Sequence, residues 1–293
     1  MKKIFALGFF DGVHLGHQAL LHACEDLSEK HNCLCGVVTF TSHPDGLVLG
    51  STPVLLNTSE DRKVLLQAYG AKTVVELPFD KALMTTPWQD FLESLLEKGA
   101  AGFVCGEDFR FGAGGSGTAE KLESFCRERG LPCAIVPEQD LDGSRISSTR
   151  IRQLLESGDL ENANKLLGHP HMLSGIVVTG KQLGRTIGVP TANIAYPGEL
   201  QPLTNGVYAC KAAVEGIEYP AVTNIGVRPT VNGQGVNAEC HLLDFSGDLY
   251  GKTLTISFHK FLRPEKKFPT LADLQQEIRK NIDQTRNFFE KSE

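Results

Sequence analysis

The chain has 293 residues, of which 41% are apolar and 22% are charged, and its formal net charge is −6. This composition predicts a globular protein with enough apolar chain for one large core or two ordinary ones. The first 168 residues carry a charge of about −7 and the rest about +1, which argues against general binding to nucleic acid. No apolar stretch approaches the roughly 18 residues of a membrane span, so we expect no membrane partner.

The first part of the chain alternates short apolar runs with helical patterns. We expect strands near residues 4–9, 34–40, 73–77, 102–105 and 133–136, and helices near 16–30, 58–69, 119–129 and from 86, 148 and 159. Thr58 opens a Thr-Ser-Glu-Asp capping box, which is a helix start signal. Strands that alternate with helices predict a parallel sheet covered on both faces, as in an α/β Rossmann-like domain.

The alternation of strand and helix patterns ends near Gly168. Strand-like segments near residues 174–179, 207–214, 219–225, 238–244 and 253–258 are separated by Gly, Pro and Asn turns, with no helical pattern between them. This pattern predicts a small antiparallel β-barrel. Thr270 opens a second capping box, so we expect a final helix to about residue 289. The sequence therefore favours two domains, residues 1–168 and 169–293.

The eight cysteines include no C-x-x-C pair. They favour free thiols over a zinc site or a disulfide framework. We expect a reducing, cytoplasmic setting.

The run Gly12-Val13-His14-Leu15-Gly16-His17 lies where the first expected strand ends and the first helix begins. A helix N-terminus at the carboxyl edge of a parallel sheet binds phosphate readily. Two histidines across that turn can stabilise charge on a leaving pyrophosphate. An H-x-x-H metal pair and a pair of ordinary loop histidines remain the alternatives.

A second polar run lies late in the first domain. Ser147, Ser148 and Thr149 lie at an expected helix start, where hydroxyls and backbone N–H groups can bind a triphosphate. Arg152 can reach back one turn to the same phosphates, so we expect it to be catalytic together with His14 and His17. A plain N-cap with a surface arginine is the alternative.

The residues from Gly8 to His17 resemble the H-x-G-H run of nucleotidyltransferases, which also occurs in transferases of other substrates. Together with Gly106–Gly112 and Ile146–Arg152, in this order along the chain, the run resembles the adenylyltransferase module of bacterial bifunctional riboflavin kinase/FAD synthetases. The resemblance implies that ATP is bound by Gly8, Phe9, Phe10, Asp11, Gly12, His14, His17, Ser147, Ser148, Thr149 and Arg152. It implies a flavin site at His43, Pro44, Asp108 and Phe109, although the residues before His43 depart from the family pattern. Phe109 and Phe111 can instead belong to the core.

A glycine-rich run opens the second domain, from Gly175 to Asn193. It lacks the G-K-[ST] of a Walker loop, but its glycines allow close approach to phosphates. Thr191 and Asn193 point the same way on an extended segment and offer oxygen ligands to Mg²⁺. A plain glycine-rich hairpin is the alternative.

This run resembles that of riboflavin kinases, as do residues 224–230, 239–244, 249–251 and 261–264. The resemblance implies that Glu239 is the catalytic carboxylate, accepting the proton of the ribityl hydroxyl. It implies a nucleotide site at Gly180, Gly184, Arg185, Gly188, Pro190, Thr191 and Asn193, with Mg²⁺ at the last two.

We therefore expect a bifunctional enzyme that uses ATP and Mg²⁺ to convert riboflavin to FMN and FMN to FAD. Its partners are then the small molecules riboflavin, FMN and ATP, and the protein is a monomer or a weak homo-oligomer. An enzyme with one active domain, and a non-catalytic module that binds flavin or nucleotide, remain the alternatives.

Overall fold

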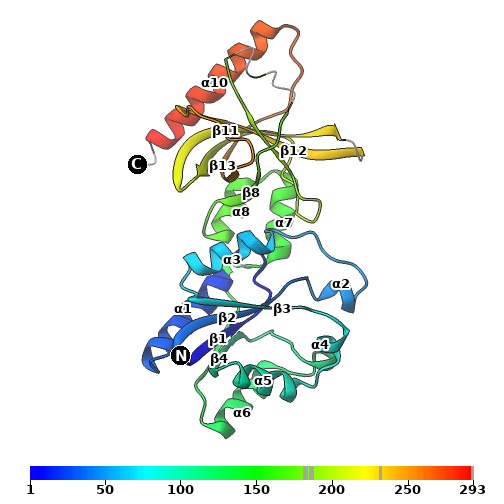
Figure 1. Ribbon diagram of the computed structural model, residues 1–293, viewed down its shortest axis with the longest axis vertical. Coiled ribbons are helices and arrows are strands. Elements are labelled where there is room, and N and C mark those ends of the chain that lie inside the picture. Colours follow the sequence, from blue (N-terminus) through cyan, green and yellow to red (C-terminus); the bar gives the residue numbers. More distant parts are fainter. Residues whose placement is uncertain (181–183, 185–187, 231–232, 292–293) are drawn as a thin grey trace. The chain divides into compact units, whose positions relative to one another are not determined.

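The computed structural model describes residues 1–180, 184, 188–230 and 233–291. The chain divides into two compact units, Met1–Ser148 and Thr149–Glu293 (Figure 1). The division falls earlier in the chain than the expected boundary near Gly168, so two short helices are grouped with the second unit. In the described part of the chain, no helix is long and apolar enough to cross a membrane.

The first unit is built on a five-stranded parallel sheet with the order β3-β2-β1-β4-β5. Its strands are β1 (Lys3–Leu7), β2 (Leu34–Phe40), β3 (Thr73–Leu77), β4 (Ala100–Gly106) and β5 (Cys133–Val136). All five expected strands are confirmed. Each is short and apolar because both faces of the sheet are covered. The strand order changes direction between β1 and β4, and ligands bind at such a point in open α/β sheets.

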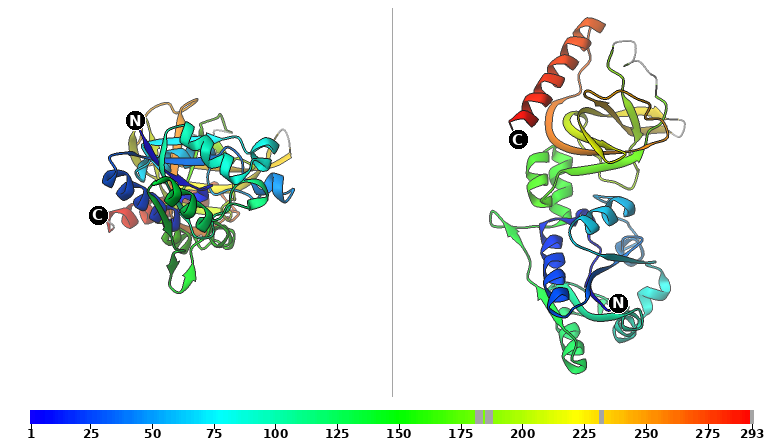
Figure 2. Two further views of the ribbon diagram at one scale, coloured as in Figure 1. Left: turned by 90° about the horizontal axis from the view of Figure 1, so that it is seen from below. Right: turned by 60° about the vertical axis from the view of Figure 1, so that its left-hand side comes forward.

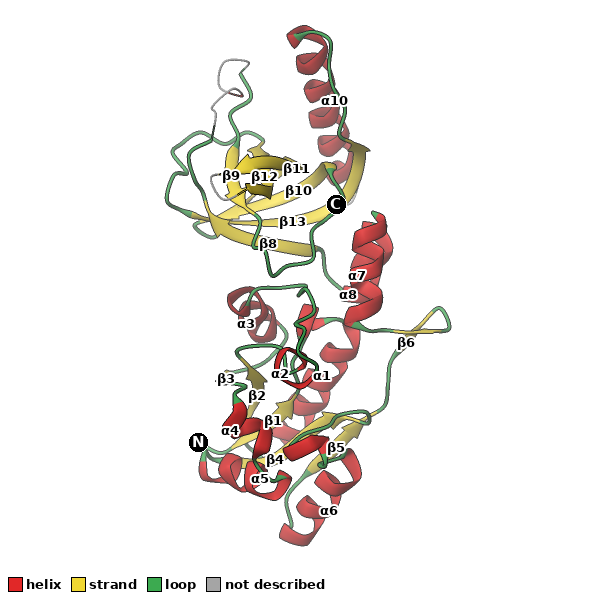
Figure 3. Ribbon diagram, turned by 90° about the vertical axis from the view of Figure 1, so that its right-hand side faces the viewer, coloured by secondary structure: helices red, strands yellow, loops and turns green. Residues whose placement is uncertain are grey.

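Helices connect and cover these strands (Figure 3). They are α1 (Leu15–Lys30), α2 (Asp45–Val48), α3 (Ser59–Ala68), α4 (Lys81–Thr85), α5 (Trp88–Glu97) and α6 (Ala119–Arg129). α5 and α6 pack with Phe5, Leu7 and Phe103 in a hydrophobic core of the unit. α1 packs against β1, β2, β4 and β5. The side chain of Thr58 accepts a hydrogen bond from the N–H of Asp61, so the expected capping box does start α3.

Some short elements of the described chain were not expected from the sequence. They are α2, α4 and a hairpin of β6 (Asp140–Leu141) and β7 (Ser144–Arg145). The hairpin leads to α7 (Ser148–Ser157), which is followed by α8 (Leu160–Leu167). Asn164 of α8 donates to the carbonyl of Phe258 and accepts from the N–H of His171, so α8 is bound to the strands of the second unit.

The second unit is a six-stranded antiparallel barrel with the order β8-β13-β10-β11-β12-β9. Its strands are β8 (His171–Ile176), β9 (Ala192–Ala195), β10 (Gly206–Val214), β11 (Ile217–Thr230), β12 (Gly233–Leu242) and β13 (Thr253–Pro264). A bridge between Val178 and Asn193 brings the two edges together. Figure 2 shows the strands curling round, with α10 (Leu271–Glu290, red) beside them. The expected barrel and C-terminal helix are confirmed.

Candidate active sites

The turn after β1 has an unusual backbone. Phe10 and Val13 have φ angles of 62° and 42°, and Gly12 has 81°. Such angles are costly for residues with a side chain, so the surroundings must hold the turn in place. Gly8 allows the close fit, because a Cβ there would lie 3.0 Å from the ring of Phe10. Strain of this kind is typical of functional sites.

The turn places His14 and His17 side by side. Nδ1 of His14 caps α1 by accepting from the N–H of His17 at 3.3 Å, and the rings stack with centroids 3.7 Å apart. Gly16 leaves room for this, because a Cβ there would lie 3.2 Å from the His14 ring. Burial, followed by the charges of His14 and Arg62, holds the pKa of His17 well below its usual range. His17 is therefore a neutral imidazole near pH 7.

Asp11 connects this turn to two distant parts of the first unit. Its Oδ1 accepts a hydrogen bond from the N–H of Leu56 at 2.8 Å, and its carbonyl accepts one from the hydroxyl of Ser148 at 2.9 Å. Ser148 starts α7, and Ser147 directly precedes it. The two expected phosphate-binding runs thus meet at Asp11 and Ser148. Thr149 and Arg152 follow on α7, which continues into the second unit.

The expected flavin residues lie on two loops. The ring of His43 meets that of Phe9 edge-on, with centroids 4.5 Å apart, and Nδ1 of His43 accepts from the N–H of Asp45. Pro44 lies at the start of α2. On the loop after β4, Asp108 is exposed and forms an ion pair with Arg145.

Phe109 is half-buried on the same loop. It stacks on the ring of Phe111, which is buried in the core, with centroids 5.6 Å apart. The core interpretation therefore holds for Phe111, while part of Phe109 stays accessible.

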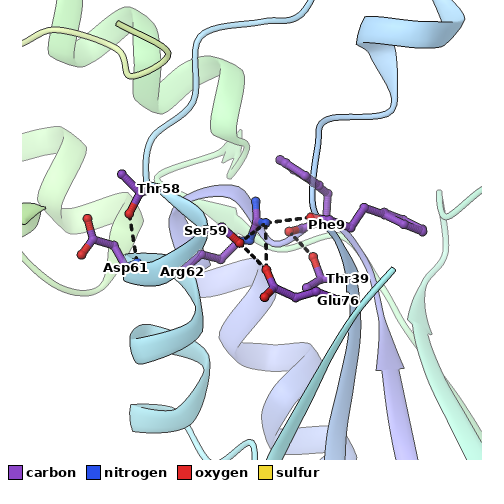
Figure 4. Close-up of polar contacts among 8 residues, drawn as sticks. Phe9, Thr39, Thr58, Ser59, Asp61, Arg62 and Glu76 are labelled. Carbon is purple, nitrogen blue, oxygen red and sulfur yellow. Dashed lines mark hydrogen bonds and ion pairs between the residues drawn. The ribbon is translucent and has the colours of Figure 1, made fainter. Parts of the chain in front are cut away.

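Sequence reasoning missed Arg62 of α3. Its side chain is 1% exposed, and its Nη2 donates to the carbonyl of Phe40 at 2.8 Å (Figure 4). A signal was present, because Arg62 occupies the same helical stripe as Leu65 and Leu66, which are buried. A charged residue on a buried stripe indicates a special role.

In the second unit, one row of paired residues crosses five strands. Arg263, Val207, Asn224, Glu239 and Asn193 are successive partners on β13, β10, β11, β12 and β9. Directly opposite residues share a face of the sheet, so their side chains lie in line. All but Asn193 line a pocket of about 480 Å³, which is closed by the apolar side chains Leu271, Leu274 and Ile278 of α10. Glu239 is half-buried in its wall.

The glycine-rich run reaches the same row. Asn193 is buried, and its Oδ1 accepts a hydrogen bond from Nδ2 of Asn237 at 3.1 Å. Gly180 lies so close that a Cβ there would be 2.5 Å from Nδ2 of Asn193. The missing side chain leaves space beside this amide, and a second lone pair of Oδ1 can face it. These features fit a hard cation such as Mg²⁺.

The segment before β9 adds a second pocket. Thr191 lines both the larger pocket and a smaller one of about 240 Å³ that extends to Leu249 and Tyr250. The carbonyl of Pro190 lies 2.7 Å from Nδ1 of His241, which fixes this segment against β12. Gly184 lines the larger pocket. Gly188 has a φ of 75° that favours glycine, and Arg185 lies outside the described residues.

The first unit has a strand–helix turn suited to phosphate at the switch point of its parallel sheet, and the second has a carboxylate in the pocket of its barrel. Together they define the class of the protein as an ATP-dependent transferase with two catalytic units. A family model described as FAD synthetase matches residues 1–150, and one described as riboflavin kinase matches residues 167–289. The chain belongs to the bifunctional riboflavin kinase/FMN adenylyltransferase family, with the FAD synthetase region first and the kinase region second.

Relatives of this family match almost the whole chain. The bifunctional riboflavin kinase/FMN adenylyltransferase of Escherichia coli K12 is 37% identical, covering 98% of this chain and 92% of the relative. That of Bacillus subtilis is 33% identical, covering 98% and 93%. A crystal structure from Streptococcus pneumoniae, described as a macrolide-efflux protein, has a TM-score of 0.84 at 29% identity and covers 98% of this chain and 94% of its own.

Proposed function

We propose that the chain carries both reactions of its family. The barrel phosphorylates the 5′-hydroxyl of riboflavin with MgATP to give FMN. The sheet unit then joins AMP from a second ATP to FMN, giving FAD and pyrophosphate. The observation that carries the proposal is the row in which Glu239 stands between Asn224 and Asn193 at the wall of an apolar pocket, in the same chain as the stacked pair His14 and His17.

For the kinase reaction, the pocket of about 480 Å³ suits the three-ring flavin, and the smaller pocket suits the nucleotide. Both pockets include Thr191, so the hydroxyl and the γ-phosphate can meet beside it. Glu239 accepts the proton of the ribityl hydroxyl as that oxygen attacks the γ-phosphorus.

The phosphates of this ATP lie against the glycine-rich segment. We assign this contact to Gly180, Gly184, Arg185, Gly188 and Pro190. Thr191 and Asn193 would hold Mg²⁺, which neutralises phosphate charge when bound.

For adenylyl transfer, an oxygen of the FMN phosphate attacks the α-phosphorus of ATP and pyrophosphate leaves. His14 and His17 donate hydrogen bonds to the phosphate oxygens, with the N-terminus of α1 beside them. Gly8, Phe9, Phe10, Asp11 and Gly12 form the rest of the turn that approaches ATP.

The second run completes this ATP site, and the flavin loops lie beside it. Ser147, Ser148 and Thr149 bind the triphosphate, and Arg152 lies one helical turn further on. His43, Pro44, Asp108 and Phe109 hold the flavin.

We further propose that residues 1–168 carry adenylyl transfer and residues 169–293 carry phosphorylation. The FAD synthetase match over residues 1–150 supports the first assignment, and the riboflavin kinase match over residues 167–289 supports the second. The free thiols of all eight cysteines support a reducing, cytoplasmic setting. We propose a monomer or a weak homo-oligomer, which sedimentation of the purified chain will test.

The deciding experiment is product analysis after incubation with riboflavin, ATP and Mg²⁺. We expect FMN first and FAD later. FMN without FAD, even when FMN is supplied, would leave a single active unit. No product from either flavin, with binding of both, would favour the non-catalytic module.

A further inference from the structure

Arg62 is a buried cation that joins the ends of three strands. From α3, its Nη2 donates to the carbonyl of Phe40, the last residue of β2, and lies 3.8 Å from Oε1 of Glu76 on β3 (Figure 4). The same nitrogen lies 3.4 Å from the hydroxyl of Ser59. The third connection runs to the residues after β1, through a ring contact with Phe9.

Phe9 is held on several sides. The Cζ atom of Arg62 lies 4.3 Å from the centroid of its ring, and the ring of His43 meets it edge-on at 4.5 Å. The hydroxyl of Thr39 donates to the carbonyl of Phe9 at 2.9 Å. Arg62, Phe9 and His43 thus form a continuous chain of ring contacts. It connects α3, the strained turn that carries His14, and the loop proposed to hold the flavin.

Burying this arginine is costly for stability. In the described part of the chain, its Nε and Nη1 are buried and make no hydrogen bond. Burial lowers the pKa of its guanidinium, and the charges of Asp11, Glu76 and Glu60 offset this only in part. An apolar residue of similar size at such a position is often as stable or more stable. Because burying this guanidinium costs folding free energy, we infer that Arg62 has a role other than stabilising the fold.

We propose that Arg62 is a positioning residue for FAD formation. By stacking on Phe9, it fixes that ring between the ATP-binding turn and the loop of His43, so that ATP and FMN meet in a reactive arrangement. The proposal rests on the adenylyl transfer assigned above to this unit. Arg62 acts through Phe9, whose ring its guanidinium contacts, and not as a group that reacts itself.

The test uses the full-length chain with Arg62→Met, Arg62→Lys, Phe9→Leu and the double variant Arg62→Met/Phe9→Leu. Methionine keeps the length and apolar bulk but loses the cation and the hydrogen bond to Phe40. Lysine keeps the charge but loses the planar group that stacks on the ring. The matched control is Arg129→Met, because Arg129 also lies over a phenylalanine, Phe125, at 3.7 Å but is on α6, with no contact to the proposed site.

The measurements are kcat and KM for FAD formation from supplied FMN and ATP, with FMN formation followed in parallel. Trp88, the single tryptophan of the chain, packs with Phe111 and Phe125 in the first unit. Its fluorescence on heating therefore reports whether that unit is folded. This readout separates lost positioning from lost structure.

We expect Arg62→Met to lower kcat/KM for FMN about tenfold or more, since a desolvated cation–π contact is worth roughly that factor. The kcat/KM of Arg62→Lys should lie between the values of Arg62→Met and the natural protein. The thermal unfolding transition that Trp88 fluorescence reports should be unchanged. Arg129→Met should keep both FAD formation and FMN formation. The double variant should be little worse than either single variant, because both act through one contact.

Two results would overturn the proposal. One is a folded Arg62→Met, or a folded Arg62→Lys if the methionine variant unfolds, with unchanged kcat and KM. The other is a double variant whose losses simply multiply, because the two residues would then act independently. If the natural protein makes no FAD from FMN, the proposed function of the unit fails instead, and that failure is seen without any variant.

Discussion

The hydroxyl of Ser148 donates a hydrogen bond to the carbonyl of Asp11 at 2.9 Å, although 137 positions separate the two residues. Asp11 belongs to the turn that carries His14 and His17, and Ser148 starts the helix that carries Arg152. Two sequence runs far apart in the chain are therefore in direct contact, which supports the proposal that they bind the same phosphates.

Changing both His14 and His17 to Ala should lower FAD formation from FMN by about 10²- to 10³-fold. The reason is that preorganised donors to a leaving pyrophosphate are then lost. FMN formation from riboflavin should stay unchanged in the same preparation. His22→Ala is the control, since His22 is exposed on the same helix. Equal loss of both products would show that the histidines do not serve adenylyl transfer specifically.

Changing Glu239 to Gln should do the reverse. The amide keeps the shape of the side chain but cannot accept the proton, so FMN formation should fall by roughly 10²- to 10⁴-fold. FAD formation from supplied FMN should persist. Glu218→Gln is the control, because this exposed residue of β11 forms an ion pair with Lys211 at the surface. A variant that still phosphorylates riboflavin at the normal rate would remove Glu239 from its proposed role.

Changing Gly180 to Ala should lower the rate of FMN formation while leaving the carboxylate of Glu239 in place. The added Cβ would lie 2.5 Å from Nδ2 of Asn193, so the amide must move away from the proposed Mg²⁺ position. A shift of this size costs about a hundredfold in rate, and the Mg²⁺ concentration for half-maximal activity should rise. Gly198→Ala is the control, since no heavy atom lies within 4 Å of its Cβ position. An unchanged Mg²⁺ dependence would argue against the site.

The barrel should lose stability in acid because of His171. Burial, with a smaller effect of His169, lowers the pKa of His171 to about 3, against an ordinary value of 6.5. Below pH 6.5, His171 is therefore protonated in the unfolded chain but stays neutral in the folded chain until the pH approaches 3. Folding stability is fully present above pH 6.5 and falls as the pH drops toward 3.

At pH 5 the loss amounts to about 2 kcal/mol, from 1.36 kcal/mol per pH unit. His171→Phe, next to Phe258, should remove this part of the pH dependence. Calorimetric unfolding at pH 7 and pH 5 measures it. The same slope in both proteins would contradict the assignment to His171.

The sheet and the barrel could be predicted from the sequence because their signals are local. Each of these signals depends on neighbouring residues only. They are the short apolar runs, the helix caps at Thr58 and Thr270, and the end of the strand–helix alternation near Gly168. The elements α2 and α4 and the hairpin of Asp140–Arg145 span too few residues to show a period. Tertiary contacts, such as the ion pair of Arg145 with Asp108, determine where they lie.

The residues of the candidate sites also fall into two groups, those that a local sequence run reveals and those that depend on tertiary contacts. His14, His17 and Glu239 stand in runs that chemistry and resemblance can recognise. The alignment of Glu239 with Asn224 and Asn193 depends on the pairing of strands far apart in sequence, which no local pattern encodes. Arg62 was missed because a single arginine on a helical stripe resembles a surface residue until its partners on other strands are known.

The row that crosses the barrel from Arg263 to Asn193 makes the proposed kinase site sensitive to strand length. Side chains alternate between the two faces of a strand, so one residue inserted into β12 just before Glu239 would turn its carboxylate away from Asn224 and Asn193. The same insertion in the turn between β10 and β11, at Glu215–Gly216, leaves every pair of the row in register. Natural variation in length should therefore gather in the turns of the barrel and avoid the strand segments on either side of this row.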